Sequence, residues 1–322
     1  MQGSDTGVIP MWGWGVFGVA VVVMLVIDLL AHRGEKSETR KSAAIWTAIW
    51  IVLGLSFTVF VWQVMGGQEA QEYLAVYTLE KSLSLDNLFV FYIIFHSLNI
   101  PQKYHHKVLY WGIIGALAFR AVFIFAGVAL VEQFAWVEYV FGGLLLYAAW
   151  RTFREDPTKQ EENKVVNWLE QYLPLSSASH EGRFFAREDG RRVATALFVA
   201  LGAIELTDVL FAIDSVAAAL AVTRQEFVLY SANIFAILGL RSLYLLLENL
   251  VVELKYLHYG LAVVLAFAAL KLLLKDVLSV PPLASVGIIV VFIGIAVWAS
   301  LRARTEDEAQ RTRTTRGAED AR

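Results

Sequence analysis

The chain has 322 residues, of which 57% are hydrophobic and 18% are charged, and its formal net charge is −3. Soluble domains carry about 25% charged residues, whereas the mean hydropathy of +0.56 and the long apolar runs indicate a membrane protein. The lack of cysteine excludes disulfides and zinc–thiolate sites. The near-neutral charge argues against a nucleic-acid partner.

Nine apolar runs predict membrane spans, each of which needs about 20 residues to cross the hydrocarbon core. We expect the first run to remain as a helix, because 1–7 lacks the basic residues of a secretory signal peptide. A hydrophilic segment, 151–192, follows the fifth run, and a polar tail after Leu301 is expected to be disordered. The predicted spans are Val8–Leu30, Ala43–Met65, Tyr73–Leu98, Val108–Val131, Phe134–Trp150, Val193–Val222, Phe227–Leu250, Tyr256–Leu278 and Leu283–Leu301.

The basic residues predict the orientation of these spans. If the N-terminus is outside, most of the 27 Lys and Arg residues fall in the inner connections, in 151–192 and in the tail. Lys and Arg are enriched in cytoplasmic loops. We therefore expect the N-terminus outside and the C-terminus in the cytoplasm.

Parts of spans three to five recur in spans six to eight. Asp86-Asn-Leu-Phe-Val-Phe resembles Asp208-Val-Leu-Phe-Ala-Ile, 122 residues later, and Arg120 of span four corresponds to Arg241 of span seven. Span three would run inward and span six outward, so the two units would be inverted repeats, as in many secondary transporters. The expected fold is an all-α polytopic membrane protein of about nine transmembrane helices containing two inverted three-helix repeats.

This organisation divides the chain into six parts. They are two N-terminal transmembrane helices (1–72), a first three-helix repeat (73–150), a cytoplasmic loop (151–192), a second, inverted repeat (193–278), a last transmembrane helix (279–301) and a disordered cytoplasmic tail (302–322).

Five carboxylates lie inside the third and sixth spans. Each costs about 2.5–3.5 kcal/mol in lipid unless it faces a partner or water, so we expect all five to face an interior site. Glu80 and Asp86 are six residues apart, as are Asp208 and Asp214. On an ideal helix the side chains of such a pair point in directions that differ by roughly 120°. Either they mark two stations along a path, or the helices are locally unwound. The five are Glu80, Asp86, Glu205, Asp208 and Asp214.

The charge balance and the ligand atoms favour a divalent cation. The five carboxylates share the membrane interior with three basic side chains, Lys81, Arg120 and Arg241. Two negative charges therefore remain without a positive counterpart. Asn87 and Asn233 add amide oxygens as supporting ligands. Such oxygen ligands suit Mn²⁺, Mg²⁺ or Ca²⁺ better than Zn²⁺ or Cu⁺.

A structural role is the alternative for these charges. For Arg120 and Arg241 we favour ion pairs that fix helix packing, whereas the matching positions of Asp86 and Asp208 favour function. Asp28 is expected to reach water at the end of span one. His105 and His106 are expected in a solvated basic loop. No Walker motif or nucleophile elbow is present, so no ATP-driven or enzymatic activity is expected.

Two motifs resemble those of a known family. They read Glu80-Lys-Ser-Leu-Ser-Leu-Asp86-Asn87 and Glu205-Leu-Thr-Asp208-Val-Leu-Phe-Ala-Ile-Asp214-Ser215. The chain is similar here, and over nearly all its length before the tail, to the TerC/Alx family of bacterial inner-membrane proteins. The resemblance implies metal homeostasis, chiefly Mn²⁺ export, in a superfamily that includes amino-acid exporters. It also places the family's acidic membrane residues on the same five carboxylates.

The expected function is a secondary transporter that exports a divalent cation, Mn²⁺ first, through carboxylates at the interface of the repeats. Proton exchange at the same carboxylates would couple the transport. The expected partners are the lipid bilayer and the divalent ion, without nucleic acid or a resident cofactor, and a homo-oligomer stays open. The alternatives are export of Ca²⁺ or a cationic amino acid, and a membrane scaffold or assembly factor that transports nothing.

Overall fold

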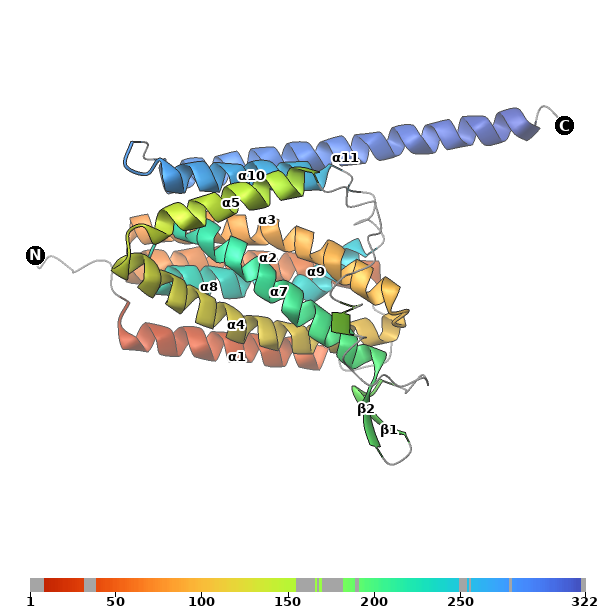
Figure 1. Ribbon diagram of the computed structural model, residues 1–322, viewed down its shortest axis with the longest axis horizontal. Coiled ribbons are helices and arrows are strands. Elements are labelled where there is room, and N and C mark those ends of the chain that lie inside the picture. Colours follow the sequence, from red (N-terminus) through yellow and green to blue (C-terminus); the bar gives the residue numbers. More distant parts are fainter. Residues whose placement is uncertain are drawn as a thin grey trace, which may run out of the picture.

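The protein is a bundle of long, roughly aligned helices (Figure 1). The computed structural model describes 9–31, 39–154, 166, 168–169, 182–188, 191–248, 254, 256–277 and 280–319, without the side chains of Ala31, Asp86, Glu188, Arg191 and 304–319. The elements are α1 (Met11–Ala31), α2 (Arg40–Val64), α3 (Gly67–Ser97), the 3₁₀ turn η1 (Gln102–Tyr104), α4 (His105–Gln133), α5 (Val137–Arg154), β1 (Phe185–Glu188), β2 (Arg191–Ala194), α7 (Ala196–Leu220), α8 (Glu226–Ile237), α9 (Leu240–Leu247), α10 (Leu257–Leu273) and α11 (Pro282–Glu319).

Six stretches of the described chain are long and apolar enough to cross a membrane: Met11–Leu30, Arg40–Val64, Gln102–Gln133, Ala196–Leu220, Glu226–Leu247 and Pro282–Ala303. The all-α membrane architecture is therefore confirmed, and a helix lies at each of the nine predicted places. Three of these nine places are not among the six apolar stretches. They hold α3, which has 31 residues but carries several charges, α5, which has 18 residues, and α10, which has 17 residues.

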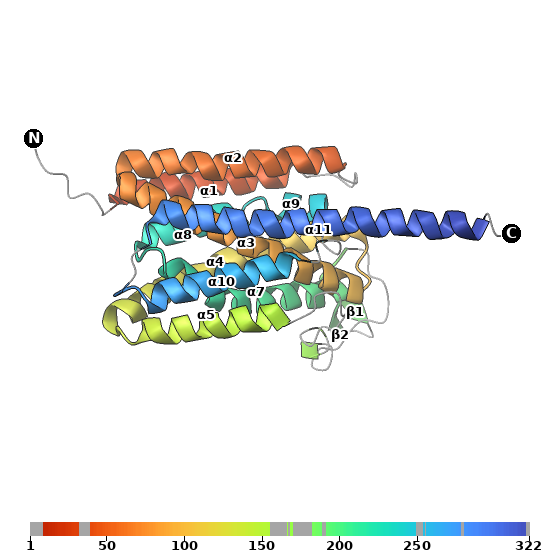
Figure 2. The same cartoon turned by 90° about the horizontal axis from the view of Figure 1, so that it is seen from above.

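The helix pairs that pack together place the interior of the bundle. α5 lies along α10, α4 along α7, and α3 along α8. α1 and α2 lie on one side of the bundle and α5 on the other (Figure 2). Rings of α1, α2 and α8 hold the first side together, with Phe57 and Phe235 at 4.5 Å between centroids and Phe17 and Phe227 at 5.6 Å. Many large apolar side chains, such as Val52 and Val122, point outward, as expected for helices that contact lipid.

The predicted span Phe227–Leu250 is not one helix. α8 ends at Ile237, Leu238 is extended, and Gly239 has a φ of +82° before α9 begins at Leu240. Only glycine adopts this left-handed conformation readily. A Cβ at Gly239 would also overlap the Trp50 side chain of α2. The break is therefore fixed by both backbone conformation and packing.

Two further segments differ from expectation. α11 continues as a helix to Glu319, whereas disorder was expected after Leu301. Ala, Glu and Arg are frequent in this tail and favour helix, and α11 runs beyond the bundle (Figure 1). Within 151–192, most of which lies outside the described residues, β1 pairs antiparallel with β2, with Phe185 opposite Ala194.

Candidate functional site: a buried ion-pair network around Arg120

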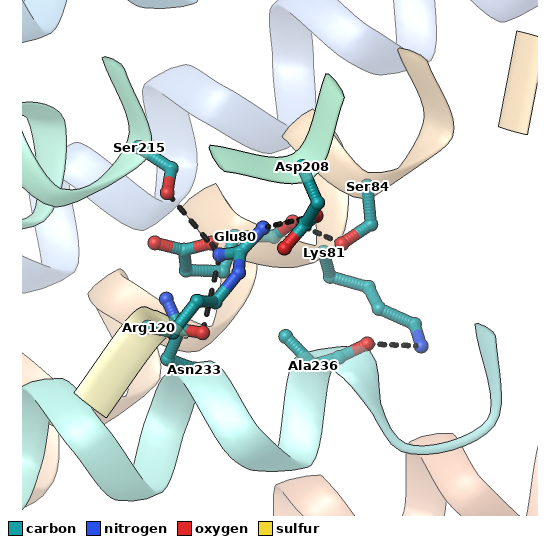
Figure 3. A network of polar contacts seen from close by, with 8 residues as sticks. All are labelled: Glu80, Lys81, Ser84, Arg120, Asp208, Ser215, Asn233 and Ala236. Carbon is teal, nitrogen blue, oxygen red and sulfur yellow. Dashed lines mark hydrogen bonds and ion pairs between the residues drawn. The ribbon is translucent and has the colours of Figure 1, made fainter. Parts of the chain in front are cut away.

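Arg120 of α4 lies at the centre of a polar network inside the bundle (Figure 3). Its side chain is 1% exposed. One terminal nitrogen donates to Glu80 Oε2 at 2.7 Å, and the other donates to Asp208 Oδ1 at 3.4 Å. A buried guanidinium therefore faces two of the carboxylates that the sequence singled out.

Two neutral groups complete the contacts of Arg120. The nitrogen that reaches Glu80 also lies 3.1 Å from Asn233 Oδ1 of α8 and 3.2 Å from Ser215 Oγ of α7. Ser215 follows Asp208 by seven residues, a spacing that puts both on one face of α7. The network thus joins α3, α4, α7 and α8. Ser215 was not predicted as a site residue, although this spacing could have indicated it.

Several buried polar atoms around Arg120 have no hydrogen-bond partner among the described residues. They include one oxygen each of Glu80 and Asp208, the Asn233 amide nitrogen and one oxygen of Glu205. More than 90% of buried polar groups in proteins are hydrogen-bonded. Three such carboxylate oxygens near one network are therefore a feature to be explained by a ligand, water or a rearrangement.

Glu205 lies against the backbone of α4. A Cβ at Gly115 would overlap its carboxylate, so the absence of a side chain at Gly115 leaves room for the acid. Glu205 and Asp208 are three residues apart on α7 and share a face, as predicted. No sequence feature beyond small residues at a helix interface indicated Gly115.

The remaining predicted site residues are placed less closely together. Asn87 of α3 is buried, and Asp214 of α7 is half-buried. The described side chains include no hydrogen bond or ion pair between Asp214 and Arg120. Asp86 lies in α3, but its side chain is outside the described part. Both α3 and α7 are continuous helices at these carboxylates, so the unwinding left open by the sequence is not seen there.

The arrangement of the described residues is not a metal centre. Among them, no three His, Asp or Glu side chains are placed so that they could hold one metal ion. Two of the predicted ligands, Glu80 and Asp208, instead share the Arg120 guanidinium. The role of the five carboxylates in binding metal stays a prediction.

Lys81 makes a contact that the sequence did not indicate. Its amine donates to the carbonyl oxygen of Ala236 at 3.0 Å, near the end of α8 (Figure 3). The last carbonyls of a helix lack backbone donors, and Gly239 ends α8 here. Lys81 thus ties α3 to the broken helix.

Arg241, the second buried arginine, binds elsewhere. It donates to Asp28 Oδ1 of α1 at 3.1 Å, and both residues are buried. The expectation that Asp28 reaches water is therefore wrong, because α9 covers it. A cavity of about 10 Å³, lined by both Arg241 and Asp208, lies between this pair and the network. It has room for about one water molecule.

A second polar cluster lies at the end of the bundle where α3 ends. His105 is buried, with Nδ1 at 3.0 Å from Glu248 Oε1, and Gln102 donates to Glu248 Oε2 at 2.6 Å. The expectation of a solvated His105 is therefore wrong, because α9 ends beside the start of α4. A cavity of about 260 Å³ is lined by His105 and Glu248 together with His96 and Tyr244.

The opposite end of the bundle carries an ion-pair cluster on Glu138 of α5. Its buried carboxylate is bound by Arg224, between α7 and α8, and by Lys275, just after α10. Charged clusters therefore close both ends of the bundle, with the Arg120 network between them.

Together, the spanning helices and the buried network define a polytopic integral membrane protein with an ionised interior. Residues 65–308 match the integral membrane protein TerC family. The chain belongs to this family.

Curated relatives from several bacteria support the assignment. The "Uncharacterized membrane protein STKORF319" of Myxococcus xanthus is 40% identical over 89% of this chain and 91% of its own length. Proteins named "Putative membrane-bound redox modulator Alx" are 38% identical in Salmonella typhi, over 86% of this chain and 89% of their own length, and 37% identical in Escherichia coli K12, over 86% and 90%. No solved structure matches the chain.

Proposed function

We propose that the chain is a secondary transporter that exports a divalent cation, with Mn²⁺ as the first candidate, from the bacterial cytoplasm across the inner membrane. The observation that carries this proposal is the set of buried carboxylate oxygens on Glu80, Asp208 and Glu205 that have no partner within the described part of the chain. Hard divalent cations take such oxygen ligands. Intramembrane carboxylates mark ion pathways more often than not.

The packing of the helices supports two inverted repeats. If α3, α4 and α5 correspond to α7, α8–α9 and α10, a pseudo-two-fold axis exchanges the α3–α8 contact with the α4–α7 contact. Both contacts are present, and the corresponding pairs α3–α7 and α5–α10 also pack together. Transporters of this kind bind their substrate at the repeat interface, where helices are interrupted. The break at Gly239 and the Arg120 network lie at that interface.

The ion pair of Arg241 with Asp28 changes the charge balance. Because Asp28 already compensates the positive charge of Arg241, only Lys81 and Arg120 compensate the five carboxylates. Three negative charges then remain. A divalent cation and one proton together would neutralise them. Three protons would neutralise the same charges, so two protons can replace the cation on the return step, and this balance supports proton exchange as the coupling. The positive-inside bias supports an outer N-terminus and a cytoplasmic C-terminus.

The name of the Alx relatives raises a redox role. This chain has no cysteine, so any such role would not use thiol–disulfide exchange by its own residues. Control of a redox-active divalent metal is a route that needs no thiol. Transport of such a metal is therefore compatible with the redox role in the name of the Alx relatives.

The test is metal content in a manganese-sensitive cell that lacks its exporter. Expression of the chain should lower cytoplasmic Mn and restore growth, and Asp208→Asn should abolish both effects because it removes a ligand charge. Glu132→Gln, which changes an exposed carboxylate at the end of α4, is the matched control and should export normally. Unchanged Mn with the wild-type chain, or full protection by an Asp86→Asn/Asp208→Asn double variant, would refute the proposal.

The rivals make different predictions. A scaffold predicts that Asp208→Asn lowers the melting temperature of the purified protein while metal content never depends on the chain. A cationic amino-acid exporter predicts stabilisation by lysine or arginine, and a Ca²⁺ exporter by Ca²⁺, rather than by Mn²⁺. Ligands that bind the native state raise its melting temperature by mass action, so one series of melting curves separates these functions.

A further inference from the structure

The position of Arg120 suggests a role beyond helix packing. Its guanidinium touches Glu80 and Asp208, which come from the leading helices of the two proposed repeats, and it also contacts Asn233. All four side chains are almost fully buried. A positive charge that belongs to the protein itself therefore lies where oxygen ligands from three helices meet.

Arg120 and a divalent cation would use the same atoms. Glu80 and Asp208 each give one oxygen to the guanidinium and keep one buried oxygen for which the described side chains provide no partner. A cation held between these carboxylates would lie within a few ångströms of the guanidinium, where like charges repel strongly in a medium of low dielectric constant. Occupation of the carboxylates by Arg120 and by the cation should therefore be mutually exclusive.

We propose that Arg120 is a tethered substitute for the transported cation, a role that rests on the transport function proposed above. When cargo is released, the guanidinium takes over Glu80 and Asp208 and offsets one of their two negative charges, and a proton from the proposed exchange offsets the other. When cargo binds, Arg120 releases these carboxylates and keeps its neutral partners, Ser215 and Asn233. Arg120 thus acts as a positioning residue for the carboxylates.

This role determines the mode of transport. A carrier must return to the loading side after it releases its cargo, and uncompensated carboxylates oppose that step in an apolar bilayer. With Arg120 in place the carrier returns without a second metal ion, so net export is possible. A carrier without this charge needs a further cation for the same step, so where protons are scarce it mainly exchanges one metal ion for another.

The experiment compares two modes of transport by the full-length chain in proteoliposomes. Release of radioactive Mn²⁺ into a chelating buffer measures net export, and release into buffer with an equal Mn²⁺ concentration measures exchange. The wild-type protein should show similar rates in both modes. In Arg120→Gln the ratio of net export to exchange should fall by about tenfold or more, as loss of the compensating charge slows the return step.

Two further variants control for a general loss of structure. Arg120→Lys keeps the charge and should preserve the ratio better than Arg120→Gln. Arg40→Gln removes an exposed arginine at the start of α2 and should leave the ratio unchanged. Equal loss of both modes in a folded Arg120→Gln protein would overturn the proposal, as would an unchanged ratio.

A binding measurement keeps the proposal testable apart from transport. In Arg120→Ala, millimolar guanidinium chloride should raise the melting temperature relative to equal NaCl, because the free ion takes the place of the missing side chain, and Mn²⁺ should compete with it. No response to guanidinium would overturn the substitute role. If wild-type liposomes carried no Mn²⁺ in either mode, the transport function would fail, whereas guanidinium rescue in competition with Mn²⁺ would still support a shared cation site.

Discussion

At the scale of single residues, the two buried arginines differ in the carboxylates with which they form ion pairs. Arg120 and Arg241 occupy equivalent positions in the repeated pattern, yet one binds Glu80 and Asp208 and the other binds Asp28. The burial of these charges could be predicted from their place in apolar runs. Their pairing could not, because it depends on which helices become neighbours, and Asp28 comes from a helix outside the repeats.

Gly115 gives a prediction at this scale. Gly115→Ala would place a methyl group where the Glu205 carboxylate lies, and overpacking of this kind costs about 1–3 kcal/mol. We expect a lower melting temperature of the purified protein and weaker Mn²⁺ export. Gly143→Ala in α5, which faces open space, is the matched control and should be neutral or slightly stabilising, since Ala is the better helix former by up to about 1 kcal/mol. Equal melting of the two variants would show that Glu205 moves freely away from α4.

At the scale of elements, the sequence predicts where helices lie better than where they break. Nine apolar runs correspond to helices, because about 20 apolar residues can satisfy their backbone in lipid only as a helix. The break at Gly239 was missed because a single glycine within an apolar run is tolerated in many helices. The helical extension of α11 was missed because charged, polar composition alone does not separate a solvated helix from disorder.

Gly239 gives a prediction at the scale of elements. Gly239→Ala should destabilise the protein, because one non-glycine residue in the left-handed region costs about 1–2 kcal/mol and the new methyl group would meet Trp50. The control is Gly287→Ala in α11, where nothing lies within 4 Å. Thermal unfolding in detergent measures both variants. If Gly239→Ala melted like its control, the break between α8 and α9 would not depend on this glycine.

At the scale of the whole molecule, charged clusters at both ends enclose the central network. At one end, Glu138 forms ion pairs with two basic residues. At the other end, Glu248 contacts His105 and Gln102. Alternating access in a carrier requires that the two ends open in turn. Sequence patterns predicted where the helices lie, and the direction of the spans stays a prediction. They could not predict these clusters, since each one joins residues from connections far apart in the chain.

Orientation is the prediction for the whole molecule. Because the natural chain has no cysteine, a single introduced cysteine is a unique label. With the N-terminus outside, Trp136→Cys, between α4 and α5, should react with a membrane-impermeant maleimide in intact cells. Ser97→Cys, at the end of α3, should react only after permeabilisation. Both wild-type residues are exposed. The reverse pattern of labelling would invert the topology and with it the direction assigned to transport.

The ion pair between Asp28 and Arg241 constrains the order in which the helices assemble during synthesis. The two residues are 213 positions apart, and ribosomes add about 5–20 residues per second, so roughly 10–40 s separate their synthesis. During that interval α1 is already available for insertion, whereas its contact with Arg241 can form only after α9 has been made. The attachment of α1 to α9 is therefore a late step in the assembly of the bundle.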